Sequence, residues 1–246
     1  MRAMGTLLIL GSKPDPTLPP RTGFDDLACA NASGHSAAKH GLPDPVYTVV
    51  TSLLASGIGS GRQSLQAMAG LKTGRVYFLK RRSRRMHPVK KIIYYAENIH
   101  KKSFLKMKPF YLERTLRALP YEFETFRPLD ESYYDGLARR FCRDDPEILS
   151  QIEKKRPSTG VIALLLGLAD HDYDRYVISG FSFELTHAYG RNPEIEDRGT
   201  EASAHADTDI LILRHLGRTL GTVYTTEAVV HEQTGLPLLP AGALEA

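Results

Sequence analysis

The stretch Arg156–Glu184 constrains the fold of this chain more than any other part of its sequence. It opens with a polar turn, Pro157–Gly160, and continues with the fully apolar run Val161–Leu168. A helix that is apolar on all its faces has to be buried. A short strand, Tyr176–Ser179, follows and ends at Gly180. Because ligands of open α/β sheets bind at helix N-termini and at the carboxyl ends of strands, this stretch predicts a site for an anionic ligand.

The N-terminal third of the chain alternates apolar strands, polar turns and helices. We predict strands over Thr6–Leu10, Leu27–Ala30, Val46–Thr51 and Arg75–Leu79, and helices over Ser33–His40 and Arg62–Gly70. The continuous apolar run Thr6–Leu10 is typical of a central parallel strand. The order of elements is that of βαβ units, so we expect an α/β fold with a mainly parallel sheet and helices on both faces.

The remaining segments give weaker patterns. Helices are predicted over Lys101–Arg117, Tyr133–Cys142, Pro146–Lys155 and Asp209–Leu220, and strands over Ile92–Tyr95 and Val223–Thr226. Tyr121–Asp130 is predicted to be irregular, and a tail with Pro237 and Pro240 follows the last strand.

The composition indicates a globular protein of the cytoplasm. Of 246 residues, 42% are hydrophobic and 24% are charged. No run approaches the ~18–20 apolar residues of a membrane span, and the N-terminus is predicted to be a strand rather than a signal peptide. Cys29 and Cys142 are far apart and have no CxxC partner, so neither a zinc site nor a disulfide framework is expected.

The stretch Lys80–Lys91 is strongly basic, with seven Lys or Arg among its residues. Such clusters bind nucleic acid, anionic lipid head groups or acidic glycans, although many are solvated loops. The chain has no helix-turn-helix, zinc-finger or RNP pattern, so no nucleic acid is expected as a partner. We expect this stretch to contact the inner face of a membrane.

Two loops at the predicted sheet edge are candidates for binding a nucleotide. Gly11, Ser12 and Lys13 follow the first strand, where backbone N–H groups and a lysine suit a phosphate. The loop is neither GxGxxG nor a P-loop, and taken alone its sequence favours a plain strand-to-loop turn. Asn31 and Ser33 follow the second strand and suit a sugar hydroxyl or a base edge, or else cap the next helix.

The polar turn before the apolar helix is a candidate anion site. Ser158, Thr159 and Gly160 offer hydroxyls and unpaired backbone N–H groups, and a capping role for Ser158 is compatible with this function. Arg156 suits a carboxylate or phosphate, unless it belongs to the solvated basic run before it.

His205 is the candidate general base. A histidine with a pKa near neutrality is the usual base for a hydroxyl nucleophile, and the alternative is a surface or capping residue at the start of the last helix. The spacing of His205, Asp207 and Asp209 matches no known metal motif, so no metal site is predicted.

These motifs together resemble the small bacterial sialyltransferases that modify lipooligosaccharide. The resemblance rests on Arg156–Gly160, on Tyr176–Phe183, and on His205 with Asp209 ahead of a helix. In the N-terminal part it rests on Gly11–Asp15 and on Cys29–Asn31. The motifs occur in the same order as in that family, whereas the middle of the chain, residues 53–155, has no match.

The resemblance implies a single Rossmann-like nucleotide-binding domain over residues 1–246, with Leu185–Ala204 as a lid. It implies a metal-independent glycosyltransferase without a cofactor. The donor would be a CMP-activated sialic-acid-like or Kdo-like sugar, and the acceptor a glycan or glycolipid. His205 would be the catalytic base. The residues expected to bind the donor are Gly11, Ser12, Lys13, Asn31, Ser33, Arg156, Ser158, Thr159, Gly160, Gly180, Ser182, Phe183 and Tyr189.

The chain departs from the family pattern at three positions. Ser12 and Ser182 stand where the family has Asn and Asp, and Glu184 stands where it has a phosphate-binding Tyr. A carboxylate does not stabilise a departing phosphate, so Lys13, Tyr189 or Arg191 are the candidates for that role.

Two other functions remain open from the sequence. One is a non-catalytic α/β protein that binds anionic glycan or nucleic acid through Lys80–Lys91. The other is an enzyme that uses S-adenosylmethionine, although no acidic residue ends the second strand. The oligomeric state also remains open, a homo-oligomer included.

Overall fold

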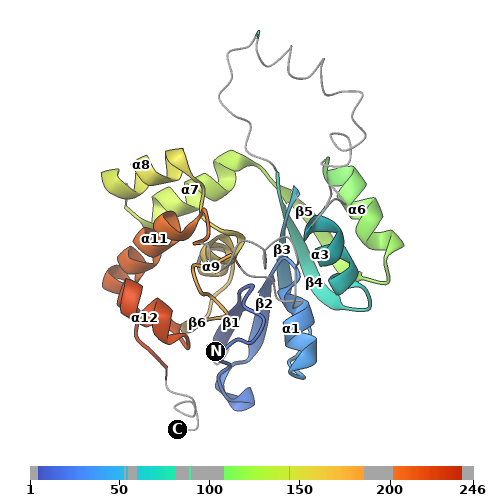
Figure 1. Ribbon diagram of the computed structural model, residues 1–246, viewed down its shortest axis with the longest axis horizontal. Helices are drawn as coiled ribbons and strands as arrows, with labels where there is room; N and C mark the ends of the chain where they lie inside the picture. The colour runs from blue at the N-terminus through green and yellow to red at the C-terminus, as the bar shows by residue number, and fades with distance from the viewer. Residues whose placement is uncertain are drawn as a thin grey trace.

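The computed structural model describes residues 5–52, 54, 60–80, 89, 108–143, 145–185 and 202–239. They form an α/β fold around one seven-stranded sheet (Figure 1). All neighbouring strands pair in parallel, in the order β5-β4-β3-β2-β1-β6-β7. The strands are β1 (Thr6–Leu10), β2 (Asp26–Ala30), β3 (Tyr47–Thr51), β4 (Lys72–Leu79), β5 (Glu122–Leu129), β6 (Arg175–Ser179) and β7 (Val223–Thr225).

The strand order places β1 at the topological switch point of the sheet. From β1 the chain adds strands on one side as far as β5, and then returns to place β6 on the other side of β1. Ligands of open α/β sheets bind at the carboxyl ends of the strands where the order reverses. The fold class predicted from the sequence is confirmed.

Helix α9 (Thr159–Asp170) is the apolar helix predicted from the sequence. It lies in the middle of one face of the sheet (Figure 1), and its residues from Gly160 to Gly167 are all buried. The Tyr47 hydroxyl donates a hydrogen bond to the Ala163 carbonyl at 2.8 Å. Gly167 lets the helix approach the sheet, because a Cβ there would lie 2.9 Å from the Tyr47 hydroxyl.

The other helices cover both faces of the sheet. Apolar residues of α7, α8, α11 and α12 join the core around α9, and α1, α3 and α6 pack on the opposite face. Their bounds are α1 (Ser33–Lys39), α3 (Ser60–Met68), α6 (Pro109–Ala118), α7 (Glu131–Phe141), α8 (Pro146–Lys154), α11 (Ala206–Thr219) and α12 (Ala228–Thr234), with a 3-10 turn at Arg21–Gly23. None of the described helices is long and apolar enough to cross a bilayer.

Two predictions about secondary structure were wrong. Tyr121–Asp130 contains strand β5 rather than irregular structure, and the proposed C-terminal tail contains helix α12. Most residues of β5 are not buried, so no apolar alternation marks it as a strand. The predicted strand Ile92–Tyr95 lies outside the described residues, and the extent of the domain over residues 1–246 stays a prediction.

We expect Gly167→Ala to destabilise the protein although alanine favours helices. The added methyl group would press on Tyr47 and on Leu7 Cδ2, which lies 3.0 Å from its position. Overpacking of this kind costs about 1–3 kcal/mol, against a gain in helix propensity of at most about 1 kcal/mol. Gly136→Ala in α7 is the matched control, because a Cβ there meets nothing within 4 Å and should stabilise the helix. Urea unfolding compares both variants, and equal free energies of unfolding would contradict the expected close packing.

Candidate active site

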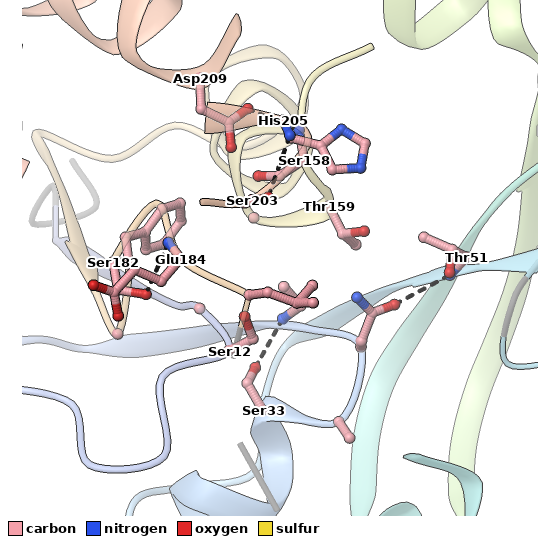
Figure 2. Close-up of a pocket in the computed structure, with 18 of the residues that line it drawn as sticks. Ser12, Ser33, Thr51, Ser158, Thr159, Ser182, Glu184, Ser203, His205 and Asp209 are labelled. Atoms are coloured by element: carbon pink, nitrogen blue, oxygen red, sulfur yellow. Dashed lines mark hydrogen bonds between the residues drawn. The ribbon is translucent and has the colours of Figure 1, made fainter. Parts of the chain in front are cut away.

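A cavity of about 270 Å³ opens at the switch point of the sheet. Its walls come from the segments that follow β1, β2, β3 and β6 and from the N-termini of α9 and α11 (Figure 2). Most residues predicted from the sequence lie in its lining, namely Gly11, Ser12, Asn31, Ser33, Arg156, Ser158, Thr159, Gly160, Gly180, Ser182, Phe183 and His205. Lys13 does not line the cavity, and Tyr189 lies outside the described residues.

The N-terminus of α9 forms one wall of the cavity. Ser158 caps the helix, because its hydroxyl accepts a hydrogen bond from the Val161 N–H at 3.3 Å. The first turn of a helix carries unpaired N–H groups and a partial positive charge. The predicted cap and the predicted anion site therefore occur at the same place.

Arg156 belongs to the lining of the cavity. Its Nη1 atom is buried and has no geometrically satisfactory hydrogen-bond partner. The guanidinium also interacts with the Tyr134 hydroxyl and lowers the pKa of Tyr134 against the effect of burial, so binding of an anion by Arg156 stays a prediction. Since Arg156 lines the cavity, it does not belong to a solvated basic surface.

The hydrogen bonding of His205 fits the role of a general base. Its Nδ1 lies 2.8 Å from the Arg156 carbonyl oxygen, which can only accept. Nδ1 therefore carries the proton in the neutral ring, and Nε2 is left as an acceptor. Burial lowers the pKa of His205 below 6.5, the Arg156 carbonyl opposes this, and the charges of Lys155 and Arg156 lower it further. The ring is thus neutral at pH 7, and it does not cap α11.

Asp209 is a buried acid in the cavity wall that the sequence did not identify as a site residue. It is 5% exposed, and its Oδ1 accepts a hydrogen bond from the Ser158 N–H at 2.8 Å. Burial raises its pKa from 3.8 to about 7, although the hydrogen bonds from Ser158 act in the opposite direction. Its position one helical turn after His205 could have identified Asp209 as a site residue from the sequence.

The loop after β1 does not offer its backbone to a phosphate in the predicted way. The Gly11 N–H donates to the Ser179 carbonyl at 2.8 Å, and the Lys13 N–H donates to the Gly180 carbonyl at 2.9 Å. Gly11 is needed for close packing, since a Cβ there would collide with the Gly180 carbonyl and with the Phe181 ring. The loop therefore packs against the end of β6.

Lys13 is not a point charge in the cavity. Its ammonium lies 2.6 Å from Oε2 of Glu227, a buried residue between β7 and α12. Lys13 and Glu227 are far apart in the sequence, so no local pattern predicts this ion pair. Lys13 therefore lies outside the cavity lining, and donor binding by Lys13 stays a prediction.

Ser33 and Asn31 connect the ends of neighbouring strands. The buried Ser33 hydroxyl accepts from the Ala30 N–H at 2.9 Å and donates to the Leu10 carbonyl at 2.8 Å. Ser33 therefore neither caps α1 nor has its hydroxyl proton available to a ligand. Asn31 has a positive φ of 52°, and its Oδ1 accepts from the Thr51 N–H at 3.3 Å. The amide NH₂ of Asn31 is the group suited to a ligand.

The segment after β6 lines the end of the cavity opposite Thr51 (Figure 2). Phe183 has a positive φ of 56°, and its carbonyl accepts from the Ser203 N–H at 2.8 Å. Glu184 pairs with Ala202 in an antiparallel bridge, so both ends of the predicted lid meet at the rim of the cavity. Residues 186–201, with Tyr189 and Arg191, lie outside the described residues.

The wall formed by the end of β3 and the start of α3 was not predicted. Thr51, Leu54, Gly61 and Ser64 contribute to it and carry no charge. No three His, Cys, Asp or Glu side chains gather as metal ligands within the described part of the chain. The ionisable groups in the lining are Arg156, His205, Asp209 and Glu184.

We expect Asp209→Asn to change how stability depends on pH. A carboxyl group whose pKa is raised from 3.8 to about 7 on folding stabilises the folded state most below pH 3.8. That contribution is lost as the pH rises through about 7, because the buried carboxylate must then ionise. Asn keeps an acceptor for the Ser158 N–H but does not titrate. The difference in free energy of unfolding between the two proteins should therefore fall with rising pH and level off above pH 7, and a constant difference would show that folding does not raise the pKa of Asp209.

Comparisons with known proteins agree on one fold. No family model matches the sequence, and no match was found among curated proteins. The structure is similar to the sialyltransferase CstII of Campylobacter jejuni in complex with the substrate analogue CMP-3FNeuAc, with a TM-score of 0.52 and 11% identity over 99% of this chain and 89% of that chain. A variant of CST-II in complex with CMP has a TM-score of 0.53 and 13% identity over 99% and 88% of the two chains.

A third similar structure is the monofunctional α-2,3-sialyltransferase Cst-I of Campylobacter jejuni. Its TM-score is 0.51 and its identity 12%, over 100% of this chain and 83% of that chain. The similarity includes the middle of the chain, for which the sequence motifs gave no match. This chain has the fold of the bacterial sialyltransferases that its motifs resemble.

Proposed function

We propose that this protein is a metal-independent glycosyltransferase that moves a sialic-acid-like or Kdo-like sugar from a CMP-activated donor to a glycan acceptor. The observation that carries the proposal is the hydrogen bond between His205 Nδ1 and the Arg156 carbonyl, because it leaves Nε2 as a proton acceptor. The shared fold supports it, since two of the similar structures hold CMP or a CMP-sugar analogue.

In this mechanism His205 Nε2 removes the proton of the acceptor hydroxyl. The hydroxyl oxygen attacks the anomeric carbon of the donor sugar, and the bond from that carbon to the phosphate oxygen breaks. The electron pair of that bond leaves with CMP, and the configuration at the anomeric carbon is inverted. The developing phosphate charge would be met by Arg156 and by the N–H groups at the start of α9, donors that are already in place.

Other parts of the site complete the proposal. Asn31 would bind the donor through its amide NH₂, and Ser182 and Phe183 would lie beside the cytidine. The segment Leu185–Ala204, whose ends meet at the rim of the cavity, would act as the lid. Tyr189 and Arg191 belong to that segment and are proposed as further donors to the phosphate.

A ligand screen by thermal shift tests the proposal against its alternatives. The probes are CMP, CDP, UDP, NAD and S-adenosylmethionine, and a ligand that binds only the folded state raises the melting temperature. A shift with CMP alone supports a CMP-sugar transferase. No shift with any of them, together with salt-sensitive binding of RNA or DNA, would instead support a non-catalytic binding protein.

We expect His205→Ala to abolish transfer and to leave CMP binding nearly unchanged. Loss of a general base lowers the rate by about 10²–10⁴-fold. Because the pKa of His205 is below 6.5, kcat/KM of the wild type should rise with pH below that value and stay level above it. His35→Ala, on the exposed surface of α1, is the matched control. Full transfer activity in His205→Ala would disprove the assignment of the base.

We also propose contact with an anionic membrane surface on the α6 side of the cavity. Helix α6 connects two parallel strands, so it begins at the carboxyl edge of the sheet, where the cavity lies. Phe110 and Tyr111 in its first turn are 66% and 39% exposed. The sequence before α6 is rich in Lys and Arg, and aromatic residues beside cations favour the interface of an anionic bilayer. The structure describes two residues of the stretch Lys80–Lys91, namely Lys80 and Val89. The Lys80 ammonium lies 2.7 Å from the Asp130 carboxylate.

Flotation with lipid vesicles tests this contact. The wild type should bind vesicles that contain phosphatidylglycerol more strongly than vesicles of phosphatidylcholine alone. The double variant Phe110→Ser, Tyr111→Ser should lose most of this binding, because the aromatic side chains no longer enter the interface. Leu238→Ser, which alters another exposed apolar residue, is the control. Equal flotation of both variants would place the contact elsewhere.

A further inference from the structure

Glu227 is a buried carboxylate just outside the cavity, at the meeting point of the loops that follow β1 and β6. The residue is 2% exposed. Oε1 accepts hydrogen bonds from the Thr17 N–H at 2.8 Å and the Gly180 N–H at 2.9 Å. Oε2 lies 2.6 Å from Lys13 Nζ and 3.3 Å from the Thr17 hydroxyl. Both carboxylate oxygens are therefore paired.

These donors form an anion site that the protein fills itself. An ammonium group and two backbone N–H groups that converge on one point would bind a phosphate or carboxylate from solution. Here the carboxylate comes from the end of the chain's last strand. This explains why Lys13 does not reach the cavity, although Gly11 and Ser12 of the same loop line it.

The carboxylate also fixes a peptide unit that lines the cavity. Gly180 has a positive φ of 71°, its N–H is held by Glu227, and its carbonyl accepts from the Lys13 N–H. The next residue, Phe181, packs its ring against Gly160 at the start of α9, where a Cβ would lie 2.7 Å from Phe181 Cζ. The position of Gly180 is thereby linked by direct packing to the anion-binding end of α9.

We propose that Glu227 is a positioning residue of the donor site. Its carboxylate is an internal anion that holds Gly180 and Phe181 in the arrangement that binds the nucleotide. The expected effect on CMP affinity rests on the proposed function. Glu227 itself does not touch the donor. If Glu227 served stability alone, its loss would lower the melting temperature and leave the CMP affinity of the folded protein unchanged.

Chemical rescue of Glu227→Ala provides the test. The variant leaves Lys13 Nζ and the N–H groups of Thr17 and Gly180 around an empty space, which formate or acetate can occupy. We expect the variant to bind CMP about tenfold more weakly than the wild type. Added formate should restore much of that affinity, whereas chloride at the same ionic strength should not.

Two variants separate the anion site from general effects. Lys13→Met combined with Glu227→Ala removes the cation, so formate should restore neither its CMP affinity nor its melting temperature. Asp130→Ala breaks the exposed ion pair with Lys80 and should leave CMP binding unchanged. CMP affinity equal to the wild type in folded Glu227→Ala, or equal rescue by chloride, would overturn the inference.

The outcomes also separate this inference from the proposed function. If the wild type does not bind CMP, the proposed function fails, and the anion site is still judged by whether formate raises the melting temperature of Glu227→Ala but not of the double variant. If Glu227→Ala does not fold, Glu227→Gln and Lys13→Met form a double-mutant cycle on CMP affinity. Non-zero coupling in that cycle supports the inference, and zero coupling overturns it.

Discussion

The packing of α9 against the centre of the sheet determines where the cavity can form. A helix that is buried on every side has one position available, between the sheet and the outer helices on the same face. Its end is fixed by the approach of Gly167 to Tyr47, and its start by the Asp209–Ser158 hydrogen bond. The N-terminus of α9 therefore lies beside the ends of β1 and β6. The partial positive charge of the helix is held at the switch point.

The surroundings of the cavity contain an unusual number of buried charged groups. Glu227 receives four donor contacts, Asp209 receives the Ser158 N–H, and Arg156 has a buried nitrogen without a partner. Burying a charge without a partner is costly, and the hydrogen bonds to Glu227 and Asp209 offset part of that cost. The positive φ of Asn31 and Phe183 is a second sign of function, because strained backbone tends to cluster at binding sites.

The sequence predicted those features that depend on local pattern. Strand β1 and helix α9 follow from continuous apolar runs, and His205 follows from the motif around it. Strand β5 was missed because it forms by backbone pairing to β4 while its side chains stay largely exposed. The ion pair of Lys13 was missed for a related reason. Its partner Glu227 is set by tertiary packing, which no spacing along the chain reveals.

The charges in the cavity restrict where a phosphate can lie under the proposed function. Glu184 stands at one end, where the resembled family has a phosphate-binding tyrosine, and a second carboxylate, Asp209, stands in the wall. Glu227 occupies the Lys13 ammonium and the Thr17 N–H of the loop after β1. Among the described residues, the start of α9 and Arg156 are then the part of the lining best suited to an anion. Under the proposed function, the leaving phosphate would therefore be stabilised at the start of α9 rather than by the segment after β6, which carries Glu184.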